Sequence, residues 1–185
     1  KILKNANIDF AILGKEETCT GDSARRLGEE YLFETLATQN IETLNKYKFN
    51  TVITACPHCF QVISKEYKDF GGDYNVIHHS TYIQQLIDEN KITVSPNIDG
   101  TVTYHDACYL GRYNDVYEAP RSIIESLLKD GEIVEMEDNK SGSLCCGAGG
   151  GNMWHEVTEG DRINIKRFNQ AIDTQADTVA TACSF

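Results

Sequence analysis

The sequence is short of positive charge and of long apolar runs. Seventeen Lys and Arg residues stand against 28 Asp and Glu among 185 residues, which gives a formal net charge of −11. Nucleic-acid phosphates are normally bound by a basic stripe, so we expect no nucleic-acid partner. No apolar run approaches the ~20 residues that cross a bilayer, so any membrane association would depend on regions outside this sequence.

A secretory signal and an initiator methionine are also missing. The first residues read KILKNANIDF, with no signal peptide in them. We therefore expect a piece of a longer chain. The expected location is the cytoplasm, with the full-length protein at the cytoplasmic face of a membrane.

Cysteine is the residue present in excess, with seven copies. An odd number argues against a closed disulfide framework. Clustered cysteines in a chain without a secretory signal are more often metal ligands or redox groups than staples. Cys145 and Cys146 are adjacent and precede GAGGG, whose backbone is free to approach another group closely. These features indicate a site.

The cysteines repeat at a fixed spacing. The same 36 intervening residues separate Cys19 from Cys56, Cys108 from Cys145, and Cys146 from Cys183. The segments VITACPHCF and VATACSF match at an offset of 127 positions, which also superimposes Cys19 on Cys146. We infer two copies of one unit, 1–95 and 96–185, the second lacking its last cysteine. Thr18 stands in the first copy where the second has Cys145.

The apolar pattern alternates between the strand and helix periods. Short buried strands are expected over 7–13, 50–55, 75–78, 101–105 and 178–182. Helices are expected over 22–47, 58–69, 80–90, 117–129 and 156–175. This alternation predicts an α/β fold of two pseudo-repeated halves, each a short, mainly parallel sheet flanked by helices. The cysteines then fall on loops at the C-terminal ends of strands, where such folds place their sites.

Four uses of cysteine are weighed against this pattern. Isolated cysteines are often buried as small hydrophobes, but repeated spacing at strand ends favours a site. The segment Cys56–Cys59 suits a zinc knuckle or a thioredoxin-like dithiol, although neither accounts for the duplicated spacing. Iron–sulfur ligation agrees best, because a cluster takes thiolates from several loops and adjacent thiolates bind different irons. Gly147 and Gly149 would aim backbone N–H groups at the sulfurs.

Four segments carry a resemblance to a known family: EETCTGDSARRLGEEYLFETLATQN, TACPHCF, YHDACYLGRYNDVYEAPR and CCGAGGGNMW. With them the chain resembles the cysteine-rich CCG domain. That domain is duplicated in the catalytic subunit of heterodisulfide reductase and occurs in iron–sulfur subunits of glycolate, lactate and glycerol-3-phosphate oxidoreductases. The chain looks closest to the fatty-acid-oxidation branch, which is linked to electron-transfer flavoprotein. The resemblance covers nearly the whole chain.

The resemblance implies [4Fe-4S] clusters, noncubane where five cysteines bind one cluster. The ligands it implies in the second copy are Cys108, Cys145, Cys146 and Cys183, with a position just beyond Phe185. The ligands it implies in the first copy are Cys19, Cys56 and Cys59, and Thr18 departs there from five-cysteine ligation. The residues expected next to the sulfurs are His58, His105, Gly147 and Gly149. A chain purified in air is expected to be metal-free.

The expected function is that of an iron–sulfur oxidoreductase module. It would pass electrons from a flavoprotein or dehydrogenase toward a quinone or a disulfide. One alternative is a heterodisulfide reductase-like enzyme that acts on a disulfide at a noncubane cluster. The other is a metal-stabilised interaction domain without a redox role.

Overall fold

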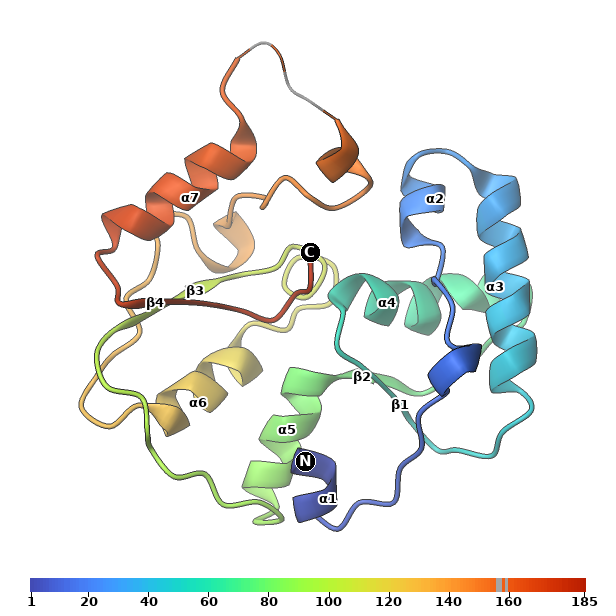
Figure 1. The fold of residues 1–185 in the computed structure, drawn as a ribbon, viewed down its shortest axis with the longest axis horizontal. Coiled ribbons are helices and arrows are strands. Elements are labelled where there is room, and N and C mark those ends of the chain that lie inside the picture. Colours follow the sequence, from blue (N-terminus) through green and yellow to red (C-terminus); the bar gives the residue numbers. More distant parts are fainter. Residues whose placement is uncertain (156–157, 159) are drawn as a thin grey trace.

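The described residues, 1–155, 158 and 160–185, form two halves in this computed structural model. Each half is built around a two-stranded parallel sheet, with β1 beside β2 and β3 beside β4. Figure 1 shows helices flanking both sheets, with α4 near the centre of the molecule. The prediction of an α/β fold in two halves with short parallel sheets is confirmed. Among the helices of the described residues, none is long and apolar enough to cross a membrane.

The first half runs from α1 to α5. Its helical elements are α1 (Ile2–Asn5), η1 (Gly14–Glu16), α2 (Asp22–Arg26), α3 (Glu30–Leu44), α4 (Pro57–Gln61), η2 (Val62–Glu66), η3 (Tyr67–Phe70) and α5 (His79–Asp88). Its strands are β1 (Val52–Thr54) and β2 (Val76–His78), with Val52 opposite Val76 and Thr54 opposite His78. A parallel pair needs a crossover connection, and the continuous run from α4 through η3 supplies it.

The core of the first half lies between α3 and the run from α4 to η3. Phe33, Ala37 and Ile41 recur every fourth residue on α3, so they lie on one side of that helix. They pack with Val62 and Tyr67, and all five side chains are buried. This packing holds α3 against the α4 run and thereby positions the cysteine loops that precede α2 and α4.

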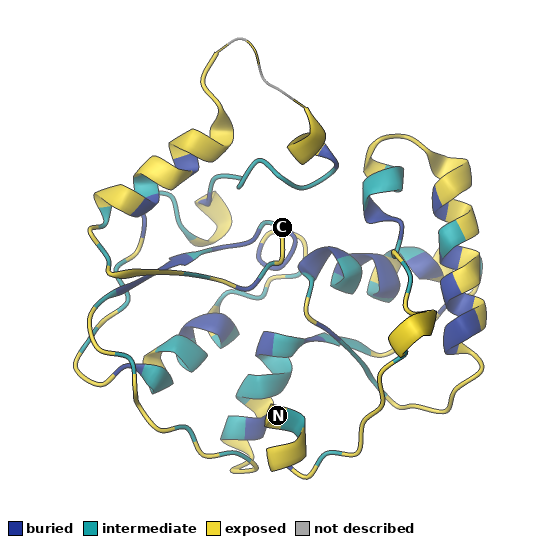
Figure 2. Ribbon diagram, in the orientation of Figure 1, coloured by how far each residue is buried: buried dark blue, intermediate teal, exposed yellow. Residues whose placement is uncertain are grey.

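The second half contains α6 (Glu118–Leu127), η4 (Lys140–Gly142), η5 (Asn152–Trp154) and α7 (Ile163–Asp173). Its strands are β3 (Val102–His105) and β4 (Thr178–Thr181), paired in register over four residues. Tyr104, Leu110 and Ala182 belong to its core, and Phe60 of α4 packs against them. The α4 helix therefore contributes to both halves, and Figure 2 shows it as one of the more buried helices.

Three predicted elements differ in the structure. The predicted helix 22–47 is divided into α2 and α3, because Gly28 adopts a φ of +85° and ends α2. The predicted strand 7–13 is a loop that continues into η1; no described strand pairs with it, and Ile12 is 81% exposed. The predicted helix 156–175 is present from Ile163 onward, and residues 156, 157 and 159 lie outside the described part of the chain.

Candidate functional site

All seven cysteines are free thiols on loops or at a helix start. Cys56 lies two residues after β1, Cys183 lies two residues after β4, and Cys108 lies three residues after β3. Cys19 is exposed, and the other six are half-buried. A cysteine used for packing would be fully buried on a strand or a helix face. This placement therefore favours a site.

The first half brings together Cys19, Cys56 and Cys59, which we call the first cysteine group. A hydrogen bond from the Cys59 thiol lowers the pKa of Cys56. The same bond and burial raise the pKa of Cys59, and the charges of Cys56 and Cys19 add to that effect. The Thr20 hydroxyl donates to the Cys59 Sγ over 3.5 Å, and the Gly21 N–H donates to the Cys19 Sγ over 3.4 Å. Donors to sulfur favour the thiolate form that metals bind.

Thr18, which replaces a cysteine of the repeat, has a structural contact here. Its hydroxyl donates to the Asn40 Oδ1 over 3.0 Å. Asn40, on α3, donates from its Nδ2 to the Cys19 carbonyl over 2.9 Å. Thr18 therefore helps to anchor the Cys19 loop to α3.

The second half brings together Cys108, Cys145 and Cys146, the second cysteine group. A hydrogen bond from Cys145 lowers the pKa of Cys108 to about 7. Cys145 also hydrogen-bonds Cys146 and raises its pKa, whereas a hydrogen bond from the His105 ring acts in the opposite direction. The Gly147 N–H donates to the Cys145 Sγ over 3.3 Å. Two predicted neighbours of the sulfurs, His105 and Gly147, thus lie at this group.

Cys183 lies close enough to His58, a residue of the first half, to raise the pKa of its ring. None of the contacts just described joins Cys183 to the second cysteine group. The His58 Nδ1 lies 2.8 Å from the Asp22 Oδ2. Its ring stacks on Tyr109, with centroids 4.1 Å apart, and lies tilted against Phe185, with centroids 4.5 Å apart. Burial opposes a charge on His58, but the bonds to Asp22 and Cys183 outweigh it and raise its pKa to about 9. His58 is therefore a cationic link between the halves.

The glycine-rich segment 147–151 approaches the first half closely. A Cβ on Gly149 would lie 2.9 Å from the His58 Cε1. A Cβ on Gly151 would lie 2.9 Å from the Leu27 Cδ1, and Gly151 also has a φ of +79°. Any side chain at these positions would force a neighbour to move. The structure thus places the Gly147 N–H at a sulfur and the Gly149 backbone against the His58 ring.

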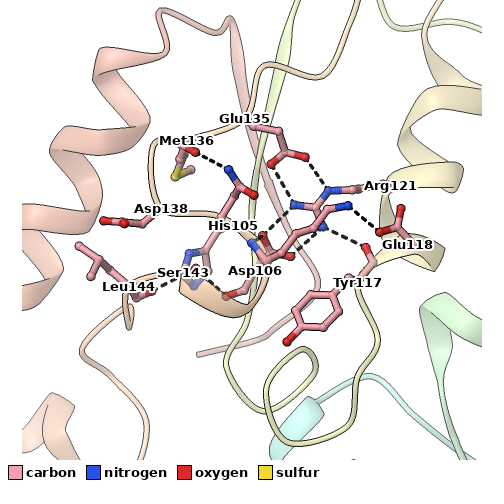
Figure 3. Close-up of polar contacts among 12 residues, drawn as sticks. His105, Asp106, Tyr117, Glu118, Arg121, Glu135, Met136, Asp138, Ser143 and Leu144 are labelled. Carbon is pink, nitrogen blue, oxygen red and sulfur yellow. Dashed lines mark hydrogen bonds and ion pairs between the residues drawn. The ribbon is translucent and has the colours of Figure 1, made fainter.

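A buried ion-pair network supports the loops of the second cysteine group (Figure 3). Arg121 of α6 donates to the two oxygens of Asp106 over 2.7 Å each and to those of Glu135 over 2.6 and 2.9 Å. The Asp106 carbonyl accepts a hydrogen bond from the Ser143 hydroxyl over 3.1 Å. Asp106 precedes Cys108 by two residues, and Ser143 lies just before the adjacent cysteines. The network therefore holds both loops together.

Sequence reasoning overlooked three contacts that organise this site. Asp22 pairs with His58 over a separation of 36 residues. Arg121 pairs with Asp106 over 15 residues, and Arg167 bonds His105 over 62. A local signal existed for both arginines, because each lies on a helix face with apolar residues, where a charge needs a buried partner.

The donor set consists of thiols, which are the ligands that iron–sulfur clusters use. Within the described residues, no three His, Cys, Asp or Glu side chains converge as a chelate of one metal ion. Zinc would need four donors ~2.0–2.3 Å from one centre. A cluster distributes thiolates over several irons, which suits thiols that arrive in groups from separate loops. The N–H donors to Cys19 and Cys145 are those that such thiolates require.

The sequence matches the Cysteine-rich domain family, CCG, over residues 1–64 and 102–185. These two segments contain all seven cysteines. The chain therefore belongs to the cysteine-rich CCG domain family, and the resemblance inferred from its motifs is confirmed.

Named relatives of the chain include iron–sulfur and quinone-linked redox proteins. It is 45% identical over 188 residues to a probable membrane-anchored ferredoxin of Chromohalobacter salexigens, covering 99% of this chain and 28% of that protein. It is 40% identical over 192 residues to the EtfAB:quinone oxidoreductase of Syntrophomonas wolfei, covering 100% of this chain and 27% of that protein.

A third relative is part of a different enzyme. The chain is 34% identical over 191 residues to one of the subunits of the dihydromethanophenazine:CoB–CoM heterodisulfide reductase of Methanosarcina barkeri. That alignment covers 100% of this chain and 46% of the relative. The chain thus spans less than half the length of each of these three relatives.

Proposed function

We propose that the chain is the iron–sulfur electron-transfer module of an oxidoreductase. It would receive electrons from a flavoprotein or dehydrogenase and pass them toward a quinone. The observation that carries this proposal is the gathering of free thiols into a group at strand ends in each half. The named relatives, a ferredoxin and an EtfAB:quinone oxidoreductase, support the same class of function. A bound [4Fe-4S] cluster would supply one-electron redox chemistry.

The seven cysteines are the proposed ligands. We assign the first cysteine group to one cluster, and the second cysteine group together with Cys183 to another, of the noncubane type. The chain's own contribution is to stabilise thiolate charge. The N–H groups of Gly21 and Gly147 donate to sulfur, and the rings of His58 and His105 lie close to Cys183 and Cys146. Donors of this kind tune the potential of a cluster.

The proposed organisation is two CCG copies, with residues 1–95 in the first and 96–185 in the second. The two family matches, one in each half, support this division. We place the working protein at the cytoplasmic face of a membrane, reached through regions outside this sequence. The relative named a membrane-anchored ferredoxin supports that placement.

Anaerobic reconstitution with iron and sulfide tests the cluster assignment. We expect bound iron and acid-labile sulfide, and EPR signals from both groups. The double variant C145S/C146S should lose the signal of the second cysteine group, C19S should perturb that of the first, and S126A, on α6, should change neither. Iron content unchanged in C145S/C146S would overturn the ligand assignment. Zinc bound in place of iron would overturn the cluster itself.

The match to part of a heterodisulfide reductase favours a second candidate function. In it, the chain acts on a disulfide at the second cysteine group. Adding an organic disulfide to the reconstituted protein should then change the EPR signal of that group, and C145S/C146S should abolish the response. No spectral change would leave electron transfer toward a quinone as the favoured function. A metal that stays redox-silent over a wide potential range would favour a metal-stabilised interaction domain.

A further inference from the structure

Arg167 is a buried residue whose side chain contacts His105, a neighbour of the second cysteine group. It lies on α7 and is 4% exposed. Its Nε donates to the His105 Nδ1 over 2.9 Å. Its Nη1 donates to the Asp138 carbonyl over 2.7 Å and to the Gln170 side-chain oxygen over 2.9 Å. All three acceptors are uncharged groups, so the guanidinium is held in place without a carboxylate hydrogen bond.

The contact with Arg167 decides which nitrogen of His105 carries the proton. A guanidinium has N–H donors and no acceptor, so the Nδ1 that receives it must offer a lone pair. The proton of the neutral imidazole then resides on Nε2. The ring of His105 also lies close enough to Cys146 to lower the pKa of that thiol, and because Nδ1 is occupied, Nε2 is the nitrogen left to face the sulfur. The Nε2–H of His105 is thus the donor that remains for the Cys146 thiol.

The guanidinium of Arg167 is not hydrogen-bonded to any carboxylate within the described residues. Its Nη2 is buried and has no hydrogen-bond partner within the described residues. Burial lowers the pKa of Arg167, although the charges of Asp106, Asp138 and Glu135 oppose that shift. Arg121 differs, because its guanidinium is hydrogen-bonded to two carboxylates. Arg167 is therefore a buried guanidinium whose hydrogen bonds go to uncharged groups, one of them His105.

The first half carries a different group at the same place of the repeat. The offset of 127 positions superimposes Arg167 on Asn40 and Cys146 on Cys19. Asn40 also supports its cysteine loop from a helix, but it does so with a neutral amide that donates to the Cys19 carbonyl. The two copies thus share the position of the support and differ in its charge.

We propose that Arg167 is a positioning residue that holds His105 as the Nε2–H tautomer and so aims an N–H donor at the Cys146 sulfur. The tautomer is a property of the protein without metal. The redox consequence rests on the proposed function, since it requires Cys146 to be a cluster ligand. An N–H donor stabilises the negative charge that reduction adds near the sulfurs, so this arrangement raises the reduction potential of the second cysteine group.

Two-bond ¹H–¹⁵N NMR of the histidine-labelled chain tests the tautomer, with His105 assigned through H105N. We expect a protonated Nε2 and an unprotonated Nδ1 in the wild type, and loss of this single pattern in R167M. K166M removes an exposed charge from the residue that precedes Arg167 on α7, and it should leave the protonation pattern of His105 unchanged. A protonated Nδ1 in the wild type, or an unchanged pattern in R167M, overturns the proposal. The wild-type spectrum decides it even where R167M does not fold.

An EPR-monitored redox titration of the reconstituted protein tests the consequence. R167M should shift the midpoint potential of the second cysteine group to more negative values. R167K should have a midpoint potential close to that of the wild type, and K166M should have the wild-type value. In an H105Q background, where an amide donates without a tautomer, R167M should add little. Equal shifts of the midpoint potential in R167M and K166M would show that Arg167 acts only through its charge, and would overturn its role in positioning His105. A chain that binds no cluster would refute the proposed function. The NMR experiment would still show which nitrogen of His105 carries the proton.

Discussion

Replacing Arg121 with Met should destabilise the protein by ~3–5 kcal/mol, because it leaves a buried carboxylate without its partner. Asp106 is 3% exposed and would lose two charge-assisted hydrogen bonds of 2.7 Å. It would keep the bond of 2.7 Å from the Lys140 N–H, which is too little to compensate a full charge. Glu135 has a side chain 33% exposed and turns to solvent at small cost. Nearly all of the loss therefore comes from Asp106.

Urea unfolding of the metal-free chain measures this effect as a fall in midpoint with an unchanged slope. The double variant D106N/R121M should recover part of the loss, since a buried amide costs less than a buried carboxylate. K140M is the control: it removes an ion pair with Glu118 whose side chains are 45% and 71% exposed, and should cost at most ~1 kcal/mol. An R121M variant within ~1 kcal/mol of the wild type, or no recovery in the double variant, would refute the reasoning.

Two further predictions concern the contact between the halves. Gly149→Ala should lower the free energy of unfolding by ~1–3 kcal/mol, because its Cβ would lie 2.9 Å from the His58 ring. Gly142→Ala should lower it far less, because no atom lies within 4 Å of the Cβ it would add. Equal unfolding midpoints for these two variants would contradict that steric argument. The pKa of His58 is raised from 6.5 to about 9, so its contribution to stability is complete below pH 6.5 and is lost as the pH rises through 9. Asp22→Asn should flatten this decline in unfolding free energies measured across that range; a decline as steep as that of the wild type would show that another group causes it.

The two cysteine groups were largely predictable because their members belong to loops that follow neighbouring elements of one half. The repeated spacing placed Cys56 and Cys183 after β1 and β4, as the structure has them. The division of the predicted helix 22–47 was not seen, although Gly28 was visible as its physical cause. The strand predicted over 7–13 failed because apolar residues form a strand only when a neighbour accepts their backbone hydrogen bonds.

The partner of Cys183 could not be predicted in the same way. The position of Cys183 in the repeat predicts which strand it follows. That position does not predict which half of the molecule its thiol faces. That is decided by α4, which contributes Phe60 to the core of the second half and brings His58 to Cys183. The close approach of Gly149 to His58 depends on the same packing. The glycines were visible in the sequence, but the surface that they approach was not.

The sequence by itself determined the fold class, the family and the loops that carry thiols, because apolar period, turn residues and cysteine spacing act over short stretches of chain. Only the tertiary structure decided the pairings of Asp22 with His58, Arg121 with Asp106, and Arg167 with His105. A buried charge or imidazole is stabilised by whichever group packing brings within hydrogen-bond distance. Which partner each group finds depends on how the two halves pack around α4. That packing is encoded by the whole chain and by no single motif.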